Sequence, residues 1–178
     1  MVTPSIEIIR AQKEHAQLLS DLSNVTFIET YRGSSADENL LEFIDRCFNE
    51  AVITSELENP SDHYFIAFAD GYPAGYMRLK EDYEDYPLNE RFHAIQLKRI
   101  YVLKDFHSKK IGAALMWHAL QFASEHNYEL IWLGVWEKNE KAISFYKRWG
   151  FLMNRNYPFY VGDEVHTDHW MVKKLSEP

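Results

Sequence analysis

The sequence is poor in cysteine, glycine and proline, and it has no long apolar run. Of its 178 residues, seven are glycine, six are proline and one, Cys47, is cysteine. A single thiol excludes an internal disulfide, which favours a reducing, cytoplasmic location. No segment approaches the roughly 18 consecutive apolar residues of a membrane span, and residues 1–5 lack the basic and apolar stretches of a secretion signal. We therefore expect no membrane partner.

Positive charge is also scarce. The 19 Lys and Arg residues are outnumbered by 27 Asp and Glu residues, which gives a formal net charge of −8. Proteins that bind nucleic acids need a basic surface, so this balance excludes nucleic acid as the main partner. It is compatible with a cationic substrate, and equally with an ordinary acidic surface. Cys47 lies in an apolar helical stripe, which favours a small buried hydrophobic residue over a catalytic thiol.

The sequence does contain enough apolar residues for a folded core. Hydrophobic residues make up 46% and aromatic residues 15%, so we expect one domain over residues 1–178. Strands are expected at residues 5–10, 63–69, 72–80, 93–102, 129–135, 151–154 and 166–175, and helices at residues 13–31, 37–53, 109–125 and 139–149. Strands and helices alternate in the second half, which indicates an α/β fold with antiparallel strands in the first half.

The strand expected at residues 93–102 changes phase along its length. Ile95 and Leu97 are apolar at odd positions, whereas Ile100 and Val102 are apolar at even positions. A regular strand cannot bury all four on one face, because its side chains alternate. Either both faces are covered, or one extra residue near Lys98 forms a β-bulge, which turns backbone groups out of the ladder.

A lysine-containing loop follows that strand and leads into a helix. Lys104, Lys109 and Lys110 stand here in an otherwise acidic chain, and Gly112 allows the backbone to approach a ligand closely. The N-terminus of a helix presents unpaired N–H groups and partial positive charge. The loop is therefore a candidate site for a pyrophosphate group, and the alternative is a plain helix start with solvated lysines.

Two runs of residues resemble the signatures of a known family. One reads His107-Ser108-Lys109-Lys110-Ile111-Gly112-Ala113, and the other reads Asn139-Glu140-Lys141-Ala142-Ile143-Ser144-Phe145-Tyr146-Lys147-Arg148-Trp149-Gly150-Phe151. The first resembles the Arg/Gln-x-x-Gly-x-Gly/Ala loop of the GNAT superfamily of N-acetyltransferases, and the second matches that family's Asn-x-x-Ala-x-x-Phe-Tyr-x-x-x-Gly-Phe motif in full. The resemblance covers residues 64–175. It implies a GNAT acyl-CoA N-acyltransferase fold, in which a mixed sheet of about seven strands is flanked by about four helices.

The resemblance also implies an enzyme that moves an acetyl group from acetyl-CoA to a primary amine without a metal. Within the superfamily, the segments 26–31, 99–102, 109–112 and 162–168 are similar to those of PaiA-type polyamine acetyltransferases, which act on spermidine or spermine. A polyamine is therefore the expected substrate. An amino acid, an aminoglycoside or a protein N-terminus stays open as the acceptor, as does a non-catalytic acyl-CoA-binding module. A homodimer also stays open.

Roles for individual residues follow from the resemblance. It assigns polarisation of the thioester carbonyl to main-chain N–H groups around Ile100, Tyr101 and Val102, and cofactor binding to the loop from His107 to Ala113. Asn139 is assigned to the pantetheine arm, although it also suits the N-cap of a helix, and both roles can hold. Tyr146 is assigned as the general acid that protonates the departing thiolate; periodicity by itself would make it a core aromatic residue.

Two residues depart from the family pattern. His107 replaces the usual Arg or Gln, and Lys110 replaces the usual first glycine. Lysine adopts positive φ only at an energetic cost. If position 110 is helical, the change is harmless; if it requires the backbone conformation of glycine, coenzyme binding is weakened.

The general base is not evident from the sequence. Residues 94–98, where related enzymes often carry a glutamate, contain no carboxylate. Our hypothesis is a water chain that ends at one of four acidic residues, Glu81, Asp82, Glu84 and Asp85, which could instead attract a cation or form an ordinary solvated loop. His166, Asp168 and His169 suggest a metal site, but alternation along a strand would turn His169 away from the other two.

Overall fold

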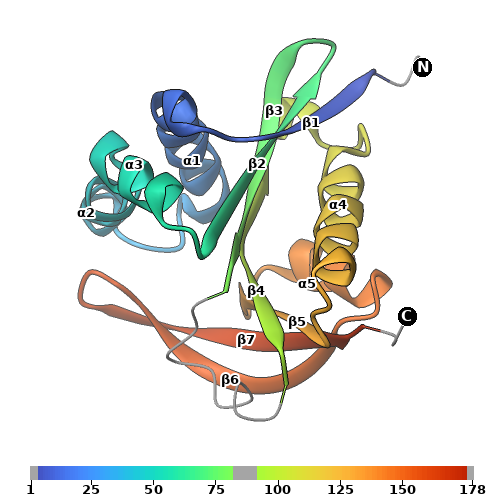
Figure 1. Cartoon of the computed structure of the whole chain (residues 1–178). Coiled ribbons are helices and arrows are strands. Elements are labelled where there is room, and N and C mark those ends of the chain that lie inside the picture. The colour runs from blue at the N-terminus through green and yellow to red at the C-terminus, as the bar shows by residue number, and fades with distance from the viewer. Residues whose placement is uncertain (1–3, 82–91, 176–178) are drawn as a thin grey trace.

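The computed structural model describes residues 4–81 and 92–175, and its strands form one sheet in the order β1-β2-β3-β4-β5-β7-β6 (Figure 1). The elements are β1 (Ile6–Arg10), η1 (Lys13–His15), α1 (Ala16–Tyr31), α2 (Asp37–Phe48), α3 (Glu50–Glu58), β2 (Asp62–Ala69), β3 (Tyr72–Lys80), β4 (Ala94–Val102), η2 (Lys104–Phe106), α4 (Ile111–Glu125), β5 (Leu130–Trp136), α5 (Glu140–Arg148), β6 (Leu152–Val161) and β7 (Glu164–Lys174). The β4–β5 pair is parallel and the other pairs are antiparallel, which confirms the mixed sheet.

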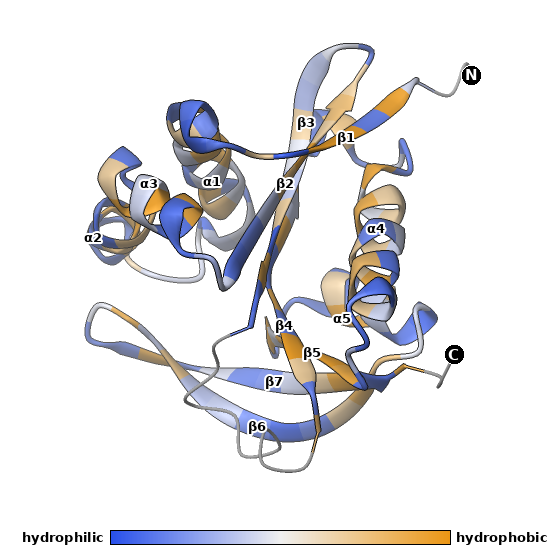
Figure 2. Ribbon diagram, in the orientation of Figure 1, coloured by the Kyte–Doolittle hydropathy of each residue, from blue (hydrophilic) through white to orange (hydrophobic). Residues whose placement is uncertain are grey.

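Helices cover both faces of the sheet. Helices α1, α2 and α3 lie on one side, and α4 and α5 lie on the other (Figure 1). Strand β2 is apolar from Tyr64 to Ala69 because both of its faces are covered: Tyr64 and Ile66 pack with α1 and α3, whereas Phe65 and Ala67 pack with α4. Figure 2 shows apolar residues along the central strands and α4. Among the described residues, no helix combines the length and apolarity that crossing a membrane requires.

Two predicted boundaries in the sequence were wrong. The helix expected at residues 37–53 is two helices, because Asn49 takes an extended conformation and its Oδ1 accepts a hydrogen bond of 3.0 Å from the N–H of Val52, which caps α3. The strand expected at residues 151–154 continues to Val161, because it pairs along its length with β7 around a turn at Gly162.

The phase change in β4 is caused by a β-bulge. Arg99 pairs with Arg78 of β3, and the next pair along the ladder joins Leu97 with Leu79, so Lys98 is an extra residue in β4. After the bulge, the even-numbered side chains point to the face that the odd-numbered ones occupied before it. All four apolar residues of the strand consequently join the same core cluster beside α4: Ile95, Leu97, Ile100 and Val102.

Beyond the bulge, β4 and β5 separate. Their parallel ladder has three residue pairs, from Ala94 with Leu130 to Gln96 with Trp132, whereas β5 pairs with β7 as far as Trp136. The two strands therefore diverge toward their carboxyl ends, where ligands commonly bind in parallel sheets. The N-termini of α4 and α5 follow these two strand ends.

Candidate active site

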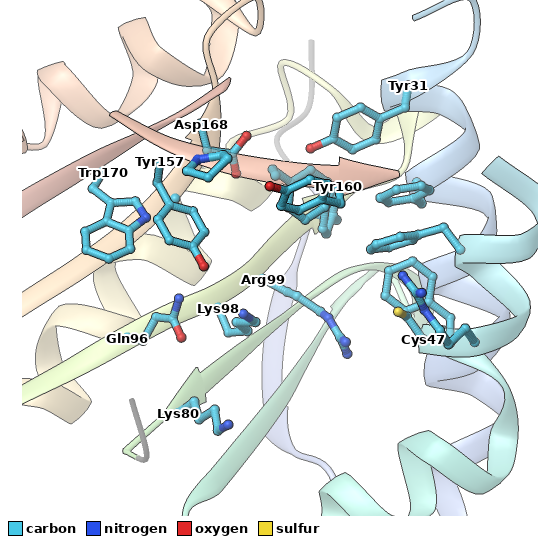
Figure 3. A pocket seen from close by; sticks show the side chains of 18 of the residues that line it. Tyr31, Cys47, Lys80, Gln96, Lys98, Arg99, Tyr157, Tyr160, Asp168 and Trp170 are labelled. Carbon is cyan, nitrogen blue, oxygen red and sulfur yellow. The ribbon is translucent and has the colours of Figure 1, made fainter. Parts of the chain in front are cut away.

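A cavity of about 550 Å³ lies on the α1 face of the sheet, where β4 and β5 separate. Most of the described residues that line it are aromatic, and they come from α1, α2, β4, β5, β6 and β7 (Figure 3). The aromatic lining residues are Phe27, Tyr31, Phe43, Phe48, Tyr101, Trp132, Tyr157, Phe159, Tyr160 and Trp170. The charged ones are Arg46, Lys80, Lys98, Arg99 and Asp168. The cavity can therefore enclose a small organic molecule whose polar groups meet a few charged side chains.

The floor of the cavity rests on a buried ion cluster. Arg99 Nη1 lies 2.9 Å from Glu56 Oε2, and Arg78 contacts both Glu56 Oε1 at 2.5 Å and Asp62 Oδ1 at 2.7 Å. The hydroxyl of Tyr64 donates a hydrogen bond to Glu56 and accepts one from Arg99. The two guanidinium groups and two carboxylates balance in charge, so Arg99 lines the cavity with a positive charge that is already compensated.

The roof of the cavity is a hairpin, β6–β7, that is tied to the start of α2. Asn39 Nδ2 donates hydrogen bonds to Asp163 Oδ1 at 3.0 Å and to Glu164 Oε1 at 2.9 Å, and Glu164 Oε1 also accepts one from the N–H of Ala36 at 2.9 Å. Gly162 at the turn has φ +60°, and a Cβ there would lie 2.3 Å from Asn39 Oδ1. Glycine is thus the residue that lets the turn approach α2.

Asp168 is the functional candidate that sequence reasoning placed in the wrong context. It lies on β7 opposite Trp136 of β5 and Tyr157 of β6, and its Oδ1 is buried with no hydrogen-bond partner among the described residues. Burial raises the pKa of Asp168 to about 6; the positive charge of Lys98 opposes this rise and the negative charge of Glu137 adds to it. The sequence signal was a carboxylate in the middle of a strand, between Thr167 and His169.

Asp168 and its histidine neighbours do not form a metal site. The described residues contain no group of three or more His, Cys, Asp or Glu side chains that could hold a metal. His166 Nε2 lies 2.8 Å from Ser35 Oγ, and His169 Nδ1 lies 2.9 Å from Asn156 Oδ1. The histidines of this segment thus bond to two different parts of the chain.

Tyr146 lies on the buried side of α5, beside the separated strands. Its ring packs against Phe145 and Phe151, as expected for a core aromatic residue. Burial raises the pKa of the Tyr146 hydroxyl, and the neighbouring Tyr31 raises it further. Burial also raises the pKa of Tyr31, to about 12, with Asp168 as a second cause. Both hydroxyls stay protonated at neutral pH, and Tyr146 can therefore combine a structural ring with a proton-donating hydroxyl.

The residues expected to bind the coenzyme surround the N-terminus of α4. Ile100, Tyr101 and Val102 lie in the part of β4 that has separated from β5, and His107 Nε2 lies 2.9 Å from the carbonyl oxygen of Val102. Ser108 and Lys109 lie in the exposed loop, whereas Ile111, Gly112 and Ala113 form the first turn of α4. This turn has no acidic residue and no side-chain cap, so its N–H groups can donate hydrogen bonds to an anion.

Two residues of the predicted coenzyme site have a conformation that the sequence left open. Lys110 is not helical: its φ of 65° and ψ of 7° place it in the left-handed region, where glycine is favoured. Asn139 is the N-cap of α5, and its Oδ1 accepts a hydrogen bond of 3.1 Å from the N–H of Ala142. The cap uses the Oδ1 atom of Asn139 and does not need its carboxamide nitrogen, so capping and coenzyme binding are compatible.

Glu81 is the one of the four acidic residues of the water-chain hypothesis that the structure describes. Glu81 contacts Nε2 of the buried His63 at 2.5 Å and is not among the residues that line the cavity. Burial acts to raise the pKa of Glu81, but hydrogen bonds from His63 and Tyr128 outweigh it and hold that pKa below its usual value. Asp82, Glu84 and Asp85 lie outside the described residues.

Comparisons with known proteins place this geometry in a family. The model of the "Acetyltransferase (GNAT) family" matches residues 19–151. An uncharacterized N-acetyltransferase of Lactobacillus delbrueckii subsp. lactis is 28% identical over 172 residues, which cover 96% of this chain and 98% of the relative. An uncharacterized N-acetyltransferase of Mycobacterium tuberculosis is 30% identical over 141 residues, which cover 79% of this chain and 85% of the relative.

Solved structures show the same fold. The PaiA N-acetyltransferase of Thermoplasma acidophilum, solved in complex with coenzyme A, has a TM-score of 0.79 and 24% identity, and the match covers 96% of this chain and 99% of that one. A GCN5-related N-acetyltransferase of Rhodopseudomonas palustris has a TM-score of 0.78 and 16% identity, covering 98% and 99%. The chain therefore belongs to the acetyltransferase (GNAT) family and is an acetyl-CoA-dependent N-acetyltransferase.

Proposed function

We propose that the chain transfers the acetyl group of acetyl-CoA to the primary amine of a small molecule that binds in the aromatic cavity. The observation that carries this proposal is the position of the cavity: Lys98 and Tyr101 of β4 and Gly134 of β5 line it on the two sides of the separated strands. A thioester held between the strands by main-chain N–H groups would thus meet an amine in the cavity.

The pyrophosphate of the coenzyme would lie at the N-terminus of α4. Gly112 supports this placement, because nothing in the described protein requires a glycine there. A Cβ on Gly112 would lie 3.8 Å from Phe145 Cζ and 3.8 Å from Val102 Cγ2, both ordinary contacts, and the φ of Gly112 is not positive. Space for a close ligand is the remaining physical reason for the missing side chain.

Substitution of Gly112 tests the placement. Gly112→Val is expected to weaken acetyl-CoA binding by about tenfold or more, because the branched side chain stands in the path of the phosphate groups. Gly112→Ala is the intermediate variant: its single methyl group meets only ordinary protein contacts and the motif allows alanine, so it should lose clearly less affinity than the valine variant. Calorimetric titration gives both affinities, and thermal unfolding verifies folding. Equal affinities of the valine variant and the wild type for acetyl-CoA would contradict the placement of the coenzyme at the N-terminus of α4.

The conformation of Lys110 allows a second test. Lys110→Gly is expected to be about 1 kcal/mol more stable than Lys110→Ala, because a left-handed backbone costs an L-residue roughly 1–2 kcal/mol. The two variants lose the same charge, so their difference isolates the backbone term. Urea unfolding measures it. If the alanine variant is as stable as the glycine variant, the backbone at position 110 is not left-handed.

The charges of the cavity favour an acceptor with one amino group. Asp168 is the one carboxylate among the described lining residues, whereas Lys80, Lys98 and Arg46 add positive charge to the compensated Arg99. A monoamine whose other groups are neutral or anionic suits this balance of charge better than a polyamine does. The polyamine is the substrate that the sequence resemblance suggested. The aromatic walls favour the polyamine instead, because they attract ammonium groups through cation–π contacts.

A panel of amines decides between these acceptors. We expect an amino acid or an aromatic monoamine to release free CoA from acetyl-CoA faster than spermidine does at equal concentration. An aminoglycoside and a peptide N-terminus complete the panel. Faster turnover of spermidine would establish the polyamine as the acceptor, and binding of acetyl-CoA without turnover of any amine would indicate a binding module.

A further inference from the structure

We propose that Asp168 is the general base that removes a proton from the ammonium group of the acceptor; this assignment rests on the proposed function. An alkylamine with a pKa near 10.4 is neutral in only about one molecule in a thousand at pH 7.4, so the enzyme needs a base beside the acceptor nitrogen. Among the described residues that line the cavity, Asp168 carries the one carboxylate. Figure 3 shows its side chain at the cavity wall, above Lys98 and Gln96.

The strand next to Asp168 leaves space beside its Oδ2 atom. Gly134 of β5 lies on the same face, and a Cβ there would come within 3.4 Å of Asp168 Oδ2. Position 134 therefore leaves room beside the carboxylate, between the side chains of Trp132 and Trp136. The same stretch of β5 borders the gap where the thioester would lie. The nitrogen of an acceptor could thus contact Asp168 and the acetyl group together.

Three other carboxylates near the cavity already have strong partners. Glu56 and Asp62 are held by the arginines of the floor, and Glu164 accepts hydrogen bonds from Ala36 and Asn39 in the roof. Asp168 differs, because its Oδ1 is buried without a hydrogen bond among the described residues. A buried polar atom that lacks a partner is costly for stability, which favours a functional reason for its presence.

The environment of Asp168 brings its pKa closer to the working pH, where a general base is most effective. Burial among aromatic side chains raises its pKa to about 6, so that it is ionised at neutral pH yet basic enough to hold a proton. The charged and titratable groups around it are Lys98 of β4, Glu137 after β5, Tyr31 of α1 and Tyr157 of β6.

The protons balance over one turnover. Asp168 takes the first proton from the ammonium group and later releases it to solvent. The freed lone pair attacks the thioester carbon, the carbon–sulfur bond breaks, and the thiolate takes a proton from the Tyr146 hydroxyl. The second proton leaves the nitrogen and restores that hydroxyl. The products are the acetylated amine, CoA with a free thiol and one proton in solution.

Asp168→Asn is the direct test, because the amide has the same shape and cannot accept a proton at neutral pH. We expect kcat/KM for an alkylamine to fall by about 100-fold or more, and the acidic limb of the pH profile near pH 6 to disappear. An aromatic amine that is already neutral at the assay pH should lose no more than a few-fold. Calorimetry should give an unchanged affinity for acetyl-CoA.

Glu137→Gln is the matched control. It removes a negative charge near Asp168 and keeps the carboxylate, so the acidic limb should shift to lower pH while the plateau rate stays unchanged.

Two results would overturn the assignment: an Asn variant that keeps the wild-type rate and acidic limb, or one that loses as much activity with the neutral amine as with the alkylamine. If the wild type binds acetyl-CoA but acetylates no amine, the proposed function itself fails, and the role of Asp168 fails with it.

Discussion

Tyr146→Phe should lower kcat by about tenfold or more while acetyl-CoA binds with nearly unchanged affinity. The ring of Tyr146 packs against Phe145 and Phe151, and phenylalanine keeps those contacts. What the variant loses is the hydroxyl, which we expect to protonate the thiolate as it leaves. The effect should therefore appear in kcat, measured by release of free CoA at saturating substrate, and be nearly absent from the calorimetric affinity.

The pH dependence gives this prediction a second readout. Burial raises the pKa of Tyr146, so its hydroxyl stays protonated throughout the physiological range. Deprotonation of Tyr146 should therefore not lower the wild-type kcat at any pH below about 10. Tyr72→Phe is a suitable control, since Tyr72 is exposed at the β2–β3 turn, and it should leave kcat unchanged. A Tyr146→Phe variant with wild-type kcat would exclude Tyr146 as the acid.

Glu56→Gln should destabilise the protein by about 3 kcal/mol or more. Glu56 bonds to Arg78 and Arg99, whose side chains are 6% and 11% exposed. An amide at this position leaves the two buried guanidinium groups with a single carboxylate in the cluster, Asp62, which contacts Arg78. Urea unfolding measures the loss of free energy, and the variant is expected to remain folded at low temperature.

Glu58→Gln is the matched control on the same helix. Glu58 pairs with Lys13, and the two side chains are 55% and 67% exposed. Exposed pairs contribute at most about 1 kcal/mol, so this substitution should be nearly neutral. If the two glutamine variants are equally stable, the floor of the cavity does not depend on the buried ion cluster.

Sequence patterns were sufficient for most of the fold. Alternation and helical spacing depend on neighbouring residues, and they placed the strands, the helices and the phase change of β4. For the phase change they left two explanations, a β-bulge or a strand covered on both faces. The pattern shows which side chains are apolar, but it does not show what packs against each face. Register with β3 was needed to identify Lys98 as the extra residue.

The acceptor side of the site was beyond reach of the sequence. Tyr31 and Asp168 are far apart in the chain and meet because β7 is inserted beside β5 and its hairpin reaches α2. Burial of Asp168 follows from this packing, and so does its raised pKa. The loop expected to bind the coenzyme, in contrast, was predicted from a contiguous motif. Even in this loop, the left-handed conformation of Lys110 depends on how the loop joins α4. The identity of residue 110 did not reveal that conformation.

The gap between β4 and β5 has a consequence for self-association. A strand with unpaired backbone groups normally invites a strand from another molecule, and this is how many sheet proteins begin to aggregate. Here β4 stays paired with β3 and β5 stays paired with β7, so the unpaired segments face each other inside the sheet instead of at its border. The main-chain groups in this gap thus stay unpaired without offering neighbouring molecules a template for fibril growth.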